Sequence, residues 1–317
     1  MTLTVTIIEA ILPILVTLGL GYFAGYRRQF DPAQASVLIR MVMLYALPLS
    51  LFGAILGMDR AHVLAAGPVA AMVIVAMASS FLVAFALLRL ATRMGTGECA
   101  LFAFAISDPS VPFIGIPVLG QLFGAASAVP VSAGSLTLNL FQLPLTLILI
   151  GTDHGDPETR PGLWAHVLHS CREPVVWTPL LALVLVLCGL HLPPALKPSV
   201  GLLGHATGGA ALFATGIVLY ARRVRFDGLV AGVVFCRNML IPGLTLLAAW
   251  LLHLTPHETQ ASVLTMSIPT ASATVILAMR YGLREREAAS ILFFGTLTAI
   301  VTMAAFIWAT GAAAPAS

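Results

Sequence analysis

Charged residues are scarce in this sequence: Asp, Glu, Lys and Arg make up 9% of its 317 residues, and Lys197 is the single lysine. Soluble domains carry about 25% charged residues, so the composition excludes an ordinary soluble protein. The longest polar stretch, residues 151–174, is too short for a separate domain. An excess of arginine mostly reflects topology in a membrane protein, so the net charge of +3 does not indicate nucleic-acid binding.

Catalytic and metal-binding motifs are missing as well. The four cysteines have no paired or metal-like spacing. There is no His-Glu-x-x-His motif, no Gly-x-Ser-x-Gly elbow and no pair of intramembrane aspartates. We therefore expect a protein that is not an enzyme and that holds no cofactor or metal.

Apolar residues fill most of the chain, with 59% hydrophobic residues and a mean hydropathy of +0.99. A helix needs about 20 mostly apolar residues to cross the hydrocarbon core of a bilayer. Ten stretches approach or exceed that length: 5–25, 33–56, 64–90, 100–119, 126–150, 175–190, 199–220, 228–252, 260–280 and 288–310. The pattern predicts an all-α polytopic membrane protein with ten transmembrane helices.

The arginines predict the orientation of these spans. Twelve of them follow odd-numbered spans: Arg27, Arg28, Arg89, Arg93, Arg160, Arg172, Arg222, Arg223, Arg225, Arg280, Arg284 and Arg286. Only Arg60 and Lys197 follow even-numbered spans. Because the positive side faces the cytoplasm, both termini should lie outside. The preference for arginine over lysine is typical of a GC-rich bacterial genome, so we expect a multi-pass protein of the bacterial inner (plasma) membrane with periplasmic termini.

The fourth and ninth spans are interrupted by proline and small polar residues, at 107–117 and 267–272. The residues that should break these helices are Pro109, Pro112, Gly115, Pro117 and Pro269. Backbone without helical hydrogen bonds is tolerated at membrane depth only where protein or a water-filled cavity satisfies it. Two breaks in matching positions of two half-chains therefore indicate the binding site of a transporter.

The two halves of the chain resemble each other weakly. Three matches occur in order, at offsets of 166, 161 and 157 residues: Pro13 with Pro179, 48–52 with 209–213, and Pro112 with Pro269. Because five spans is an odd number, the second set enters the membrane inverted relative to the first. We expect one repeat over residues 1–150, a cytoplasmic connecting loop over 151–174 and a second repeat over 175–317. Chance matches among 20 prolines are the alternative.

Several motifs resemble those of the auxin efflux carrier family. The similar segments are Leu44–Phe52 around Ala46-Leu47-Pro48, Phe113–Pro117, Gly204–Gly216, and Pro269-Thr270-Ala271 followed by Leu277-Ala278 and Tyr281-Gly282. This family includes bacterial malonate permease-like members and is related to the bile acid/sodium symporters. The resemblance implies ten helices in 5+5 inverted repeats, with the broken helices of spans 4 and 9 crossing at the site. It also implies a scaffold of spans 1, 2, 6 and 7 against which a transport bundle of spans 3–5 and 8–10 moves.

Two positions depart from the family pattern. The family commonly has Asn just before the Gly-x-Pro segment, where this chain has Ser110, and often has Asn shortly after the proline of span 9, where it has Ala273. These changes bear on the substrate more than on the fold.

Asp108 is the first candidate site residue, because it lies about halfway along span 4. A carboxylate at membrane depth is costly and is a functional hypothesis by default. We expect it to couple transport to a proton or to Na⁺. The alternative is a structural role, as the partner of an arginine or the cap of the second half-helix.

Arg237 lies about ten residues, or about 15 Å, into span 8 and is therefore also near the midplane. It could bind the carboxylate of a substrate, or it could form a salt bridge with Asp108 that only holds the bundle together. Asn139, an amide at the centre of span 5, could contact substrate or bridge helices. The further candidates for substrate binding are Ser110, Pro112, Thr270 and Ser272. Hydroxyls near a break can also satisfy freed backbone.

Half-helices that begin near the midplane direct free N–H groups and a positive dipole end toward the break, which suits an anion. We therefore expect a secondary transporter of a small organic anion, a malonate-like mono- or dicarboxylate, working by alternating access and coupled to H⁺. The alternatives are a sodium-coupled symporter of a larger amphipathic anion and, in other classes, a channel or a non-transporting receptor. The expected partners are the anion, H⁺ or Na⁺ and the lipid bilayer, and a homodimer is one oligomeric state open to the chain.

Overall fold

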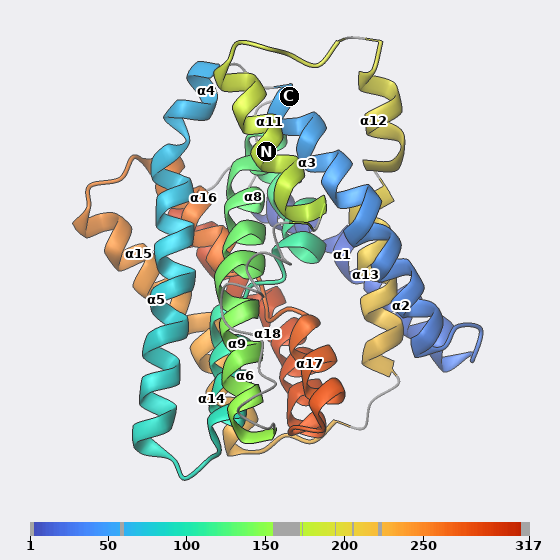
Figure 1. The fold of residues 1–317 in the computed structure, drawn as a ribbon, viewed down its shortest axis with the longest axis vertical. Helices are drawn as coiled ribbons and strands as arrows, with labels where there is room; N and C mark the ends of the chain where they lie inside the picture. The colour runs from blue at the N-terminus through green and yellow to red at the C-terminus, as the bar shows by residue number, and fades with distance from the viewer. Residues whose placement is uncertain are drawn as a thin grey trace.

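The computed structural model describes residues 3–57, 60–154, 172, 174–193, 195–204, 206–220 and 224–311. Within these residues all regular structure is helical, and the one extended pairing is an isolated bridge between Pro109 and Thr270 (Figure 1). Of the connecting loop predicted over 151–174, residues 155–171 and 173 lie outside the described part.

The helices follow one another along the chain with short connections. In order they are α1 (Leu3–Tyr26), α2 (Pro32–Met41), α3 (Leu47–Leu56), α4 (Arg60–Ala65), α5 (Gly67–Ala91), α6 (Thr96–Ser107), α7 (Ile116–Phe123), α8 (Ala128–Thr137), α9 (Leu143–His154), α11 (Pro174–Leu187), α12 (Lys197–Gly204), α13 (Ala206–Tyr220), α14 (Gly228–Phe235), α15 (Ile241–Leu251), α16 (Pro256–Met266), α17 (Ala273–Tyr281) and α18 (Glu285–Thr310).

Short segments of other helical types join several of these helices. A 3-10 turn, η3 (Gly124–Ser127), separates α7 from α8. Four five-residue π-helical segments are η1 (Val42–Ala46), η2 (Val111–Gly115), η4 (Leu138–Gln142) and η6 (Cys236–Leu240).

Proline accounts for the position of all four π-helical segments. A proline stands two residues after the end of each one, at Pro48, Pro117, Pro144 and Pro242. Its ring clashes with the carbonyl four residues earlier and it has no N–H to donate, so the regular ladder is interrupted there. The N–H of the residue before each proline donates instead to a carbonyl five residues back, as from Leu47 to Val42. Such π-bulges are frequent at functional sites.

Six helical runs among the described residues are long and apolar enough to cross a membrane. They are Pro32–Gly53, Val63–Ala91, Ile116–Gly151, Lys197–Tyr220, Gly228–Leu251 and Glu285–Thr310. α6 and residues 176–187 are apolar but shorter. Helical segments overlap each of the ten predicted stretches. The fold is therefore an all-α membrane protein.

The helices pack in two groups. In the first, α13 lies against α1 and α2, and α3 lies against α11 and α12. The contact between α1 and α13 is close enough to require glycine, because a Cβ at Gly21 or Gly216 would overlap backbone atoms of the other helix. In the second group, α5 packs on α6, α8 and α16, while α18 packs on α14, α16 and α17. Figure 1 shows α5 and the α1–α2–α13 group on opposite sides of the molecule.

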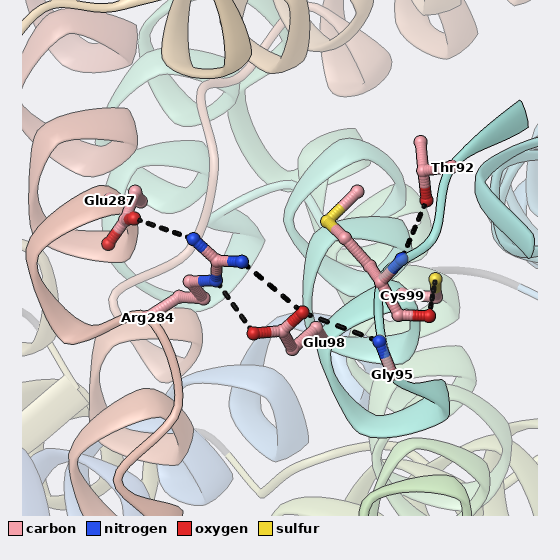
Figure 2. A network of polar contacts seen from close by, with 7 residues as sticks. Thr92, Gly95, Glu98, Cys99, Arg284 and Glu287 are labelled. Atoms are coloured by element: carbon pink, nitrogen blue, oxygen red, sulfur yellow. Dashed lines mark hydrogen bonds and ion pairs between the residues drawn. The ribbon is translucent and has the colours of Figure 1, made fainter.

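Different elements lie at the two ends of the molecule. α4 and α12 lie at one end, and the turn between α5 and α6 lies at the other (Figure 1). At this second end Arg284 joins the starts of α6 and α18: its Nε donates to Glu98 at 2.7 Å, and its guanidinium also pairs with Glu287 (Figure 2). The hydrogen bond to Glu98 raises the pKa of Arg284, which therefore stays charged. The ion pairs tie together the ends of the two segments that contain the helix breaks.

Candidate functional site

The two helix breaks face each other inside the protein. α6 ends at Ser107 and α16 ends at Met266, and after each of them the backbone is non-helical for a few residues. The N–H of Ser110 donates to the carbonyl of Pro269 at 2.8 Å, and the N–H of Ala271 donates to the carbonyl of Asp108 at 3.2 Å. The freed backbone of each break is thus satisfied by the other break, as buried backbone at membrane depth requires.

Asp108 lies at this crossing, as the residue that ends α6. Its side chain is fully buried. Neither carboxylate oxygen has a hydrogen-bond partner among the described residues, and no ion pair joins it to Arg237. A buried polar group without a partner is costly and calls for an explanation such as a bound ion or a catalytic or transport role. Asp108 is the strongest such case here, because both of its oxygens are unpartnered.

Arg237 reaches the crossing from η6 and is also fully buried. Its side chain makes four hydrogen bonds, all to backbone carbonyls of the two breaks. Nε and one terminal nitrogen, Nη2, donate to Ile268 at 3.0 and 2.9 Å, Nη2 also donates to Met266 at 2.6 Å, and Nη1 donates to Ile106 at 3.0 Å. Because a guanidinium has five N–H donors, one is left without such a bond. In this arrangement one N–H of the guanidinium remains available to a substrate carboxylate.

The position of Arg237 has an electrostatic consequence for the whole crossing. The carbonyls that it binds are those at or near the C-terminal ends of α6 and α16, where each helix dipole is negative. The buried cation compensates these two negative ends. The two half-helices that begin at the crossing, η2 with α7 and α17, direct their positive ends toward it. Once the negative ends are compensated, the crossing favours an anion.

The hydroxyl groups of the second break fall into two sets. Thr270 donates to the carbonyl of Ala105 at 2.8 Å and so ties the second break to α6. Ser272 and Thr274 are buried, and their hydroxyl oxygens have no partner among the described residues. In the first break, Ser110 is buried and its carbonyl accepts the N–H of Ile114 at 2.8 Å. Ser272 is therefore free for a ligand, whereas Thr270 is engaged.

The residues that interrupt the helices also bring neighbouring elements close. Pro109 and Pro269 are buried at the crossing itself. A Cβ at Gly115 would lie 2.9 Å from Ile268, so glycine permits η2 to approach the second break. Pro117 packs against Gly208 of α13, in the first helix group. Pro112 lies in η2, and its side chain lies outside the described part of the structure.

Asn139 is the predicted residue that the structure does not bring into the crossing contacts. Its amide donates to the carbonyl of Ser135 in its own helix at 2.8 Å. Sequence reasoning overlooked Gln142, three residues further on. The Gln142 amide donates to the carbonyl of Met77 at 3.0 Å and to the hydroxyl of Ser107 at 2.9 Å, and its oxygen has no partner among the described residues. A second buried amide in span 5 was the available signal.

Asn238, the neighbour of Arg237, points to a different helix. Its amide donates to the carbonyl of Gly295 and to the hydroxyl of Thr298, both at 2.8 Å. It holds η6 against α18, while Arg237 holds the crossing.

Comparison with known proteins places this chain in a family of membrane transporters. Residues 6–152 and 158–307 match the family model described as "Membrane transport protein". The chain belongs to this family, which is the auxin efflux carrier family indicated by its motifs. It is 29% identical over 300 residues to the "Uncharacterized transporter YfdV" of Escherichia coli K12, covering 94% of this chain and 96% of the relative. The proteins of that name from Escherichia coli O157:H7 and Shigella flexneri match equally. The family, the apolar helices and the bacterial relatives identify a multi-pass inner-membrane transporter.

Proposed function

We propose that this transporter is a secondary carrier that moves a small organic anion, of the malonate-like mono- or dicarboxylate class, together with a proton. The observation that carries the proposal is the crossing of the two breaks. There Arg237 compensates the negative ends of α6 and α16, and the positive ends of two further half-helices remain for a ligand. Ser272 and the one free N–H of Arg237 supply further donors.

Asp108 supplies the coupling in this proposal. Its carboxylate and a bound anion would share one buried site, where two like charges repel strongly. The anion is therefore bound when Asp108 carries a proton. The proton and the anion then cross the membrane together, and they carry less negative charge than the anion alone. Release of the proton on the other side then expels the anion.

The movement that we propose uses the two helix groups. α1, α2, α3, α11, α12 and α13 would form a scaffold, and the remaining helices would form the mobile bundle that contains the crossing. Ten spans arranged as two inverted sets of five, with both termini periplasmic, would give such a carrier two equivalent access states. The packing groups and the asymmetry of the arginines support this arrangement.

A thermal-shift measurement on the purified protein tests the choice of substrate class. Malonate at about 100 times its Kd should stabilise the fold by about 2.7 kcal/mol. That corresponds to a rise in Tm of roughly 5 °C or more for a chain of this size. The matched control is malonamide, which has the same shape without charge and should leave the Tm unchanged.

The same measurement separates the alternatives. Stabilisation by malonate should be stronger at pH 6 than at pH 8 and should not depend on Na⁺, because the proton is the proposed partner. A shift that requires Na⁺, or one given only by larger amphipathic anions, would favour the sodium-coupled alternative. Equal stabilisation by malonamide would refute the anion proposal.

A further inference from the structure

A cavity lies between α3 and α12, away from the crossing, and no part of the proposed mechanism uses it. The volume of this cavity is ≈ 330 Å³. That volume is within the range of small-molecule sites.

One face of each helix lines the cavity. On α12 the lining residues are Lys197, Val200, Gly201 and Gly204, and on α3 and its C-terminal end they are Leu49, Ser50, Gly53 and Gly57. The residues of each set are one, three or four positions apart, which places them along one side of a helix. Ala125 of η3 and Leu192 complete the wall. The cavity therefore lies where the first helix group meets the element that follows α7.

The cavity is closed at its base and open at its rim. Gly204 is buried, and a Cβ there would lie 3.2 Å from Ser50, so the two helices are in contact at that point. Gly57, Ala125 and Lys197 are exposed. One turn beyond Gly204, Gly208 packs against Pro117, next to the first helix break. The base of the cavity is thus on the side nearer the crossing, and the contact between Gly208 and Pro117 separates the cavity from the crossing.

Lys197 is the only charged residue among the described residues that line the cavity. It has no ion pair within the part of the chain that the structure describes. A free ammonium group above a small, glycine-lined cavity is suited to an anion with one or two carboxylates. α12 lies at the end of the molecule opposite the Arg284 ion pairs (Figure 1), the end that the arginine distribution places outside.

We propose that this cavity is an outer docking site, where a small carboxylate is held by Lys197 before it reaches the crossing. The inference rests on the proposed anion transport and adds the place and the residue of first contact. An anionic lipid headgroup shares the chemistry of a carboxylate, and the experiment separates the two.

Exchange of labelled malonate in phosphatidylcholine vesicles, which contain no anionic lipid, gives the first test. Lys197→Gln should raise the KM for external malonate roughly fivefold at low ionic strength and leave the maximal rate unchanged, because a charge at the rim acts mainly on encounter. Added salt should shrink the difference, and Lys197→Arg should restore the KM. Arg60→Gln, which removes the other positive charge predicted outside, is the matched control and should leave the KM unchanged.

A binding measurement keeps the inference testable apart from transport. In a cysteine-free background, Ala125→Cys places a thiol in the cavity wall, and a membrane-impermeant cationic methanethiosulfonate should modify it from outside. Malonate should slow this modification several-fold, malonamide should not, and Lys197→Gln should abolish the protection.

The outcomes are distinct. If the parent protein exchanges malonate but shows neither the KM change nor the protection, the docking site is refuted and the proposed function stands. If the parent does not exchange malonate although malonate protects the thiol, the proposed function fails and the docking site stands. An effect of Lys197→Gln that appears only in vesicles with phosphatidylglycerol would assign the cavity to a lipid headgroup and overturn the inference.

Discussion

Arg237→Ala should destabilise the protein more than any other single change at the crossing. The substitution leaves the carbonyls of Ile106, Met266 and Ile268 without the donor that the structure gives them. Each buried polar group left unpaired costs about 1–3 kcal/mol, so we expect the three carbonyls together to cost at least about 3 kcal/mol. The Tm, followed by tryptophan fluorescence in detergent, should fall by roughly 10 °C. Arg40→Ala is the matched control: Arg40 is exposed on α2, and its loss should change stability by less than about 0.5 kcal/mol.

Two further variants distinguish a role in holding the crossing from a role as counter-ion. Arg237→Lys keeps the charge but cannot reach three carbonyls in the same geometry, so its stability should lie between those of the parent and the alanine variant. The double variant Asp108→Asn with Arg237→Gln removes both charges. If Arg237 mainly neutralised Asp108, this protein would regain the parent's stability. We expect it to remain as unstable as Arg237→Gln alone, because the carbonyls are still unpaired.

Asp108→Asn should uncouple transport from the proton gradient. A pH difference of one unit across the membrane, coupled to one proton, supports about tenfold accumulation of substrate, equivalent to about 1.4 kcal/mol. The neutral amide cannot release a proton, so the accumulation ratio of malonate should fall from about ten to about one. Exchange of internal for external malonate should persist, because it needs no net proton movement.

Asp31→Asn provides the control for this experiment. Asp31 is exposed, caps α2 and has no part in the proposed coupling, so its amide variant should accumulate malonate as the parent does. Accumulation by Asp108→Asn equal to that of the parent would show that Asp108 is structural and that coupling, if present, lies elsewhere.

The sequence indicated the main features of the fold through its prolines and its apolar stretches. The prolines at 109 and 269 lie where the structure interrupts the helices. The number of membrane crossings is harder to read, because α6 has only 12 residues and the 3-10 turn between α7 and α8 is too short to divide residues 116–151 into two apolar runs. The prolines at 48, 144 and 242 also have a structural effect, since each places a π-helical segment just before it.

The partners of the buried polar residues could not be read from the sequence. Helical spacing gives the depth of Arg237 but not the direction of its side chain, and the π-helical geometry of η6 changes which face it occupies. Its acceptors are backbone carbonyls, which every residue has, so no side-chain pattern marks them. The cavity beside Lys197 is formed by two helices that are far apart in the sequence, so it could not be predicted from the sequence either.

Counterflow in proteoliposomes tests the central claim, that the crossing belongs to a carrier of small carboxylates, most directly. Vesicles loaded with unlabelled malonate should take up external labelled malonate to a transient peak several times the equilibrium level. Vesicles loaded with malonamide should show no such peak. Such an overshoot requires one site that is exposed alternately to the two sides. Uptake that rises to equilibrium without an overshoot, or no uptake of malonate at all, would contradict the account.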